Sequence, residues 1–123
     1  MHVRGIRGAT TVEANTPAAI LEATQELLGE IVRANGVEPD EVAAVFFAAT
    51  PDLDAVYPAE GARRMGWVAV PLLSVADLDV PGAVDRCVRV LLLWNTARAQ
   101  DEIVHVYLRG ARSLRPDLSG PGV

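Results

Sequence analysis

The chain has 123 residues, half of them apolar, and a net charge of −5 at pH 7. This length and composition predict one domain with a sizeable core, and they argue against disorder and against a membrane span. The acidic balance argues against nucleic acid and anionic membranes as partners, because both repel a negatively charged protein. All eleven basic residues are arginine, so lysine Schiff-base chemistry is excluded and every cation is a planar fork suited to carboxylates.

The sequence offers few residues for metal, redox or nucleophilic chemistry. Cys87 is the only cysteine, so it can form neither an internal disulfide nor a cysteine metal cluster. His2 and His105 are too far apart to show metal-ligand spacing. We therefore expect no metal and no cofactor. Residues 1–7 lack the apolar segment of a secretory signal, and a location in the reducing cytoplasm is the expectation.

The first third of the chain predicts a strand followed by a long helix. Residues 2–12 mix β-branched residues with Gly5 and Gly8, where another group can approach the backbone closely. Thr16 is a good N-cap and Pro17 suits the first helical position. Apolar residues then recur at helical spacing until the stop signal of residues 35–36 (Asn-Gly).

The middle of the chain predicts alternating short elements. Residues 42–49 form a nearly continuous apolar run, as in a buried strand, and residues 50–54 form a loop. Residues 57–65 are expected to make one or two helical turns, and residues 67–72 a further strand despite Pro71. Residues 73–86 are expected to be mostly loop, because they contain a Pro-Gly turn signal.

The last third predicts two more strands, residues 88–95 and 103–108. In the second of these strands His105 and Tyr107 would share one face, since side chains alternate along a strand. Residues 1–115 are expected to form the single domain and residues 116–123 a mobile tail rich in Gly and Pro.

These elements predict an α+β fold with a mixed five-stranded sheet, one long helix and one short helix. One long helix can cover only one face of such a sheet. Strands as apolar as these need their other face covered too, so the pattern predicts burial of that face against other subunits.

Arg89 is a permanent cation inside the apolar residues 87–94. Such a group is costly among aliphatic side chains unless an anion meets it. A carboxylate of the protein, a strand end that reaches water, or a ligand would each satisfy it, and the sequence leaves these open. Arg7, between two glycines, and Arg115, before a proline, are further candidates, and together the three suggest a site for a compact ligand with several carboxylates.

Six segments occur in order along the chain: residues 4–13 (RGIRGATTVE), 49–53 (ATPDL), 57–59 (YPA), 87–90 (CVRV), 105–108 (HVYL) and 114–118 (LRPDL). Together they resemble the monofunctional, trimeric chorismate mutases of the AroH class. The resemblance implies a homotrimer that encloses a pseudo-α/β barrel, with active sites in clefts between subunits. It also implies the Claisen rearrangement of chorismate to prephenate in the shikimate pathway of aromatic amino-acid biosynthesis, a reaction that requires no nucleophile, metal or redox cofactor.

The same resemblance assigns roles to individual residues. It makes Arg89 the main catalytic cation, placed against the ether oxygen and a carboxylate, with Arg7 and Asp77 also catalytic. Arg7 and Tyr107 would hold the side-chain carboxylate, and Arg63 and Arg115 the ring carboxylate near the cleft mouth. The apolar lining would comprise Tyr57, Ala59, Leu73 and Leu114. Ser74, in the place of a family cysteine, would bond the ring hydroxyl.

Two positions depart from the family pattern. At the position of Asp77 the family commonly has Glu, which binds the ring hydroxyl. Because Asp is one methylene shorter, its contact with that hydroxyl needs a backbone shift or a bridging water. An ordinary loop carboxylate is the competing interpretation of Asp77. Glu60 stands where a cation is often found, which argues against a role for position 60 in anion binding. The alternative functions are a trimeric enamine/imine deaminase of similar fold and a non-catalytic trimer that binds metabolites as a sensor.

Overall fold

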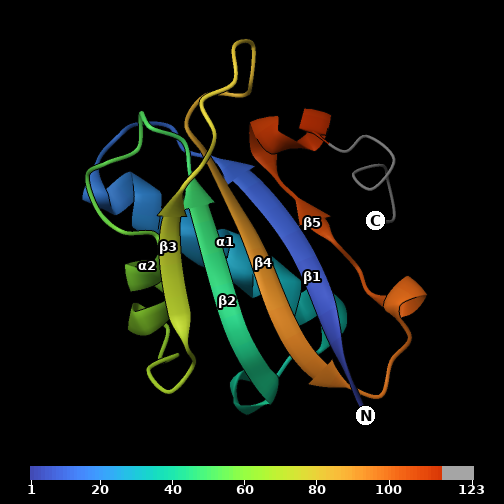
Figure 1. The fold of residues 1–123 in the computed structure, drawn as a ribbon. Coiled ribbons are helices and arrows are strands. Elements are labelled where there is room, and N and C mark those ends of the chain that lie inside the picture. Colours follow the sequence, from blue (N-terminus) through green and yellow to red (C-terminus); the bar gives the residue numbers. More distant parts are fainter. Residues whose placement is uncertain (115–123) are drawn as a thin grey trace.

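A mixed five-stranded sheet forms the centre of the fold and confirms the predicted α+β architecture (Figure 1). The strand order is β3-β2-β4-β1-β5, with β4 antiparallel to both β1 and β2, and with β5 and β3 added in parallel at the two edges. The computed structural model describes residues 1–114; Arg115 and the tail predicted for residues 116–123 lie outside the described residues. The elements are β1 (His2–Thr11), α1 (Pro17–Asn35), η1 (Pro39–Glu41), β2 (Val42–Ala49), α2 (Ala59–Arg64), β3 (Leu72–Ala76), β4 (Cys87–Thr96), η2 (Gln100–Glu102), β5 (Val106–Tyr107) and η3 (Arg109–Leu114).

Helix α1 begins and ends where the local sequence predicts. The Thr16 hydroxyl accepts a hydrogen bond from the Ala19 N–H at 3.2 Å, and Pro17 opens the helix. Gly36 ends it in the left-handed conformation, with φ of 78° and its N–H bonded to the Val32 carbonyl, a backbone that favours glycine. Local capping chemistry therefore decides both ends of this helix.

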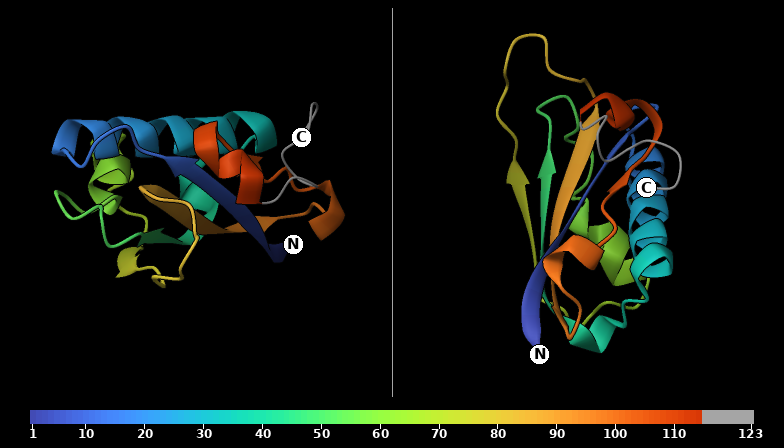
Figure 2. Two further views of the ribbon diagram at one scale, coloured as in Figure 1. Left: turned by 90° about the horizontal axis from the view of Figure 1, so that it is seen from above. Right: turned by 90° about the vertical axis from the view of Figure 1, so that its right-hand side faces the viewer.

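Both α-helices lie on the same face of the sheet, so within residues 1–114 no α-helix covers the other face, which is called the open face below (Figures 1 and 2). Alternate residues of each strand point toward α1 and form one core with it, including Ile6, Val45, Phe47, Val88 and Leu92. Gly8 is part of this closely packed face: a Cβ there would lie 3.0 Å from the Val106 carbonyl oxygen. Among residues 1–114, no helix is both long and apolar enough to cross a membrane.

The strand predicted for residues 67–72 is wrong, because pairing starts at Leu72 and runs to Ala76. Gly66 adopts φ of 94° after α2, and the Trp67 N–H bonds back to the Ala62 carbonyl. This turn buries Trp67 and Val70 in the core without a strand. Part of the segment predicted as loop, residues 73–76, is consequently the edge strand β3.

The last strand is much shorter than the predicted residues 103–108. Only Val106 and Tyr107 pair with β1. The neighbouring Val104 binds the side chain of Asn35 through both its N–H and its carbonyl, at 2.8 and 2.9 Å, so a side chain replaces the strand partner. His105 lies outside the strand, and its Nδ1 accepts the Arg7 backbone N–H at 2.9 Å.

Asn35 joins the end of α1 to this segment and is 1% exposed. Its amide also donates to the Ile31 carbonyl at 3.0 Å. We expect Asn35→Ala to lower the free energy of unfolding by about 2–4 kcal/mol, because it leaves buried backbone groups without these partners. Urea denaturation at fixed protein concentration measures the loss. Arg33→Ala, which removes only an exposed ion pair with Glu30, is the control and should leave the unfolding midpoint nearly unchanged.

Candidate active site

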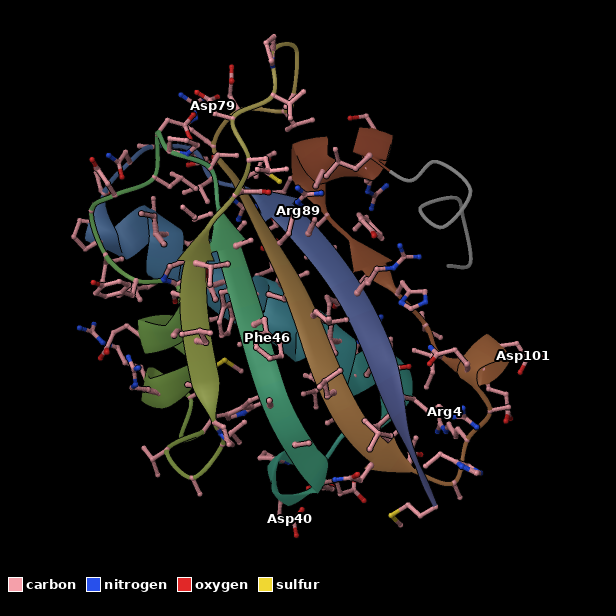
Figure 3. The ribbon with its side chains drawn as sticks, viewed as in Figure 1. Arg4, Asp40, Phe46, Asp79, Arg89 and Asp101 are labelled. Carbon is pink, nitrogen blue, oxygen red and sulfur yellow. The ribbon has the colours of Figure 1, made fainter. Side chains whose placement is uncertain are left out.

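The open face of the sheet carries two of the predicted cations above an apolar surface. Strand register places Arg89 opposite Ala9 on one side and Ala48 on the other, and Arg7 opposite Leu91. All of these residues alternate with core residues, so their side chains leave the sheet on the face opposite α1. Figure 3 shows Arg89 and Phe46 on this face.

A hollow with a volume of about 350 Å³ lies over this part of the open face. Its lining combines Arg7, Arg89 and Tyr107 with apolar groups that include Phe46, Leu91 and Leu114. Four residues with predicted roles, Arg7, Arg89, Tyr107 and Leu114, are therefore brought together from β1, β4, β5 and η3. The hollow offers two permanent cations beside an apolar wall, a setting suited to a small anion with an apolar body.

The apolar sequence neighbours of Arg89 suggested that aliphatic side chains enclose it, but the structure shows that they do not. The two-residue period of β4 sends Val88 and Val90 to the core and Arg89 to the open face, where its side chain is 51% exposed in the single chain. A carboxylate of the protein nevertheless meets it. The Nε and Nη2 atoms donate to the two oxygens of Asp77 at 2.8 and 2.7 Å.

Contacts other than the one with Arg89 also hold Asp77 in place. It follows the last residue of β3, and its backbone N–H donates to the Ala49 carbonyl at 2.9 Å. Its side chain is only 11% exposed and accepts the Leu78 N–H as well as the guanidinium. Asp77 is therefore more than an ordinary loop carboxylate, because it fixes the plane and direction of the Arg89 fork.

The ion pair shifts the pKa values of both partners. The hydrogen bonds from Arg89 lower the pKa of Asp77, against an opposing effect of partial burial, and the Leu78 N–H adds to the lowering. The same contact raises the pKa of Arg89. Both groups are therefore charged throughout the neutral range, and Arg89 acts as a cation of fixed orientation and not as an acid or a base.

Arg7 is arranged differently from Arg89. Its backbone is fixed by β1 and by the hydrogen bond to His105, while its side chain lines the hollow. Within residues 1–114 its guanidinium makes no ion pair with a carboxylate. Arg7 can therefore bind an incoming carboxylate without giving up an ion pair within the described residues.

A second hollow, of about 660 Å³, lies where residues 49–58 pass the end of β3. Tyr57 and Ser74 line it, and it shares no lining residue with the first hollow. Tyr57 is 73% exposed. The Ser74 hydroxyl accepts the Ala59 N–H at 3.3 Å and so satisfies the start of α2. Two predicted substrate-binding residues thus lie away from the cations within one chain.

The other predicted residues of this region do not converge on either hollow. Ala59 is buried in the core at the start of α2. Leu73 is exposed on the open face of β3. Arg63 lies on α2 and pairs with Glu60 at 3.2 Å, and Arg64 approaches the same carboxylate at 3.4 Å. Glu60 therefore acts as the counterion of these arginines.

Cys87 lies at the start of β4 but does not supply a nucleophile. Its side chain is 2% exposed, and burial raises the pKa of its thiol to about 11. A thiol of this kind stays protonated at neutral pH and packs as a small apolar group. In the described part of the chain, no three His, Cys, Asp or Glu residues are grouped so that they could hold a metal ion.

Sequence analysis predicted Leu114 in the apolar part of the first hollow but missed two other apolar residues there. Phe46 and Leu91 line it, but the nearly continuous apolar runs of β2 and β4 do not show which residues face the core. The position of Arg89 contained the missing signal. Since Arg89 must leave the core, residues separated from it by two positions along β4 share its face, and this reasoning identifies Leu91.

We predict that Arg89→Gln raises the pKa of Asp77. The shift in the native protein is downward, so the stabilisation by the pair is fully present above the ordinary aspartate pKa and is lost as the pH falls through the lower native value. The carbon-13 signal of the Asp77 carboxyl group, followed by NMR from neutral to acid pH, measures the midpoint. Arg7→Gln is the control and should leave it in place. An unchanged midpoint in Arg89→Gln would show that the pair does not persist in solution.

Comparison with known proteins identifies a family for this chain. The model of a family described as chorismate mutase type I matches residues 3–118. The chain is 56% identical over 117 residues to chorismate mutase AroH of Thermus thermophilus, covering 94% of this chain and 96% of that protein. It is 46% identical over 120 residues to chorismate mutase AroH of Bacillus subtilis (strain 168), covering 97% and 94%.

A solved structure shows the same likeness in three dimensions. It is described as a chorismate mutase from Clostridium thermocellum, and it matches with a TM-score of 0.87 and 45% sequence identity, covering 89% of this chain and 97% of the other. All three relatives carry the same activity in their names. The comparisons therefore confirm the resemblance drawn from the six segments, and none of these three relatives is named as a deaminase.

Proposed function

The chain belongs to the chorismate mutase type I family, and we propose that it converts chorismate to prephenate in clefts between the subunits of a homotrimer. The observation that carries this proposal is the pair of guanidinium groups over one apolar hollow, Arg89 held by Asp77 and Arg7 unpaired within residues 1–114. Prephenate is the product that this reaction supplies to aromatic amino-acid biosynthesis. A cytoplasmic location stays a prediction.

The reaction needs only placement and charge from the protein. One C–O bond breaks as one C–C bond forms within a single substrate molecule, and negative charge builds up on the ether oxygen. A guanidinium has five N–H donors, and Asp77 engages two of those of Arg89. The remaining donors are available to the ether oxygen and a substrate carboxylate. Because Asp77 holds the fork beforehand, little reorientation is needed as charge develops.

Arg7 and Tyr107 would hold the substrate in its compact conformer. Both line the hollow that contains Arg89, and Arg7 is suited to a bidentate contact with the side-chain carboxylate. Holding the two reacting ends of the substrate together converts a rarely populated conformer into the bound one, which lowers the barrier without a chemical group. The apolar wall formed by Phe46 and Leu91 would contact the carbon skeleton.

The trimer is proposed from the open face of the sheet. Phe46, Leu73, Val75 and Leu91 are between 38% and 53% exposed there, and a second copy packed on this surface would remove them from water. A neighbouring copy could also bring its Tyr57, Arg63 and Ser74 to the hollow that holds Arg7 and Arg89. This arrangement would unite residues that the single chain keeps in separate places, with Arg63 near the ring carboxylate.

We predict that Arg89→Ala lowers kcat by about 10²–10³-fold while the protein stays folded, because one well-placed donor to developing charge is lost. Arg89→Lys should also be severely impaired, since an ammonium cannot both bind Asp77 bidentately and reach the ether oxygen. Loss of the chorismate ring-diene absorbance measures turnover, and circular dichroism checks the fold. Near-normal turnover in a folded Arg89→Ala protein would exclude the proposed role.

The same assay separates the alternative functions. The unmodified protein should consume chorismate and form prephenate. A metabolite sensor would bind chorismate, detected by calorimetry, without consuming it. A deaminase would act on an enamine or imine substrate, releasing ammonia, and leave chorismate unchanged.

Mixing two impaired variants tests whether the site lies between subunits. Arg89→Ala lacks the cation of one side of the cleft, and Arg63→Ala lacks that of the other. The two variants are refolded or co-expressed in equal amounts so that they form hybrid trimers. If the two sides of each cleft come from neighbouring chains, random assembly leaves about a quarter of all clefts with both arginines intact. We expect the mixture to recover activity above that of both parent variants. Activity that never exceeds the parents' average would place both arginines in one subunit's site.

A further inference from the structure

We infer that Thr50 and Asp52 are positioning residues, which hold the end of the loop that leads from Asp77 back into β4 and so set the geometry of the ion pair between Asp77 and Arg89. The inference rests on the proposed function for its effect on turnover. Residues 49–53 stand out in the sequence as one of the six segments, yet no substrate contact is assigned to Thr50 or Asp52. Figure 1 shows the loop of residues 77–86 projecting beyond the ends of β2 and β3.

A hydrogen bond to β2 fixes the point where the loop leaves the sheet. Strand β3 ends at Ala76, and the Asp77 N–H then bonds to the carbonyl of Ala49, the last residue of β2. The loop returns to the sheet at Cys87, the first residue of β4. Both partners of the ion pair therefore lie close to the loop ends, Asp77 at its start and Arg89 three residues after its last residue.

Thr50 joins the return of the loop to the end of β2. Its hydroxyl accepts the Cys87 N–H at 3.0 Å, and its own N–H donates to the Cys87 carbonyl at 3.1 Å. The hydroxyl hydrogen is directed to Asp52, with a distance of 2.5 Å between the two oxygens. A short side chain thus extends the pairing of β2 with β4 by one further step.

Asp52 completes the connection one residue earlier in the loop. Its second carboxylate oxygen accepts the Arg86 N–H at 2.9 Å. Arg86 has φ of 44°, a left-handed backbone that residues with a Cβ adopt at a penalty. The carboxylate therefore binds the backbone of Arg86 in the conformation that turns the chain into β4.

Neighbouring contacts agree with this role. The Arg86 carbonyl accepts the Val12 N–H at 2.8 Å, and the Arg86 Nε donates to the Val12 carbonyl at 3.1 Å. The turn is therefore also bonded to the residue that follows β1. Burial raises the pKa of Asp52, but the hydrogen bonds from Thr50 and Arg86 bring it below its ordinary value. The side chain is thus an ionised acceptor with both oxygens engaged.

Asp52→Asn tests the inference, because the amide can replace only one of the two acceptors. We expect kcat to fall at least about tenfold with KM changed much less, since a displaced cation weakens transition-state contacts more than ground-state binding. We also expect the Asp77 carboxyl titration to move toward higher pH as the pair with Arg89 loosens. The matched control is Asp85→Asn, which removes the same charge from an exposed neighbour of Arg86 and should change neither quantity.

Thr50→Val and Thr50→Ser provide an independent pair of variants. The first removes the hydroxyl at constant shape and should reproduce the Asp52→Asn effects, while the second keeps the hydroxyl and should restore most of kcat. A wild-type protein that does not consume chorismate would refute the proposed function, and the Asp77 titration would still test the positioning role. Folded Asp52→Asn and Thr50→Val proteins with wild-type kcat and an unchanged Asp77 midpoint would overturn the inference.

Discussion

The bidentate contact between Arg89 and Asp77 is the interaction on which the site depends. It joins a strand in the middle of the sheet to the loop at the end of an edge strand. Without this contact, a guanidinium on an open face would sample many rotamers, and its N–H groups would be hydrogen-bonded to water. Paired on one edge, it keeps its charge and presents the remaining N–H groups in a fixed direction. For a rearrangement without proton transfer, such a pre-oriented donor is what the protein can contribute.

The open apolar face links assembly to function. A sheet covered by helices on one side has an apolar surface on the other, and here that surface carries both Arg7 and Arg89. Packing another copy against it would exclude water from the cations and so strengthen their interaction with an anionic substrate. The same subunit contact would then bury the exposed apolar side chains and enclose the active site. The trimeric barrel stays a prediction, and it gives a common physical reason for the exposed apolar residues and for the two separate hollows.

The short segment after β2 explains why the ion pair can be fixed at the end of a long loop. Backbone and side-chain groups of residues 49–52 bond to both ends of the loop. The backbone of Asp77 and the residues that lead into Arg89 are therefore fixed from the sheet side. Residues that do not contact the substrate can in this way determine where the catalytic side chains lie.

The sequence by itself determined the features that depend on local chemistry or on unusual residues. Capping residues predicted α1, six ordered segments identified the family, and the anomaly of a cation in an apolar run singled out Arg89. Tertiary structure alone decided which carboxylate meets Arg89, because Asp77 reaches it only through the pairing of β3, β2 and β4. It also decided the short β5, where the Asn35 side chain replaces a strand, and the turn that buries Trp67. In the first two cases the partner lies in another part of the chain, and in the third the turn depends on how Trp67 packs into the core. Periodicity carries no information about either.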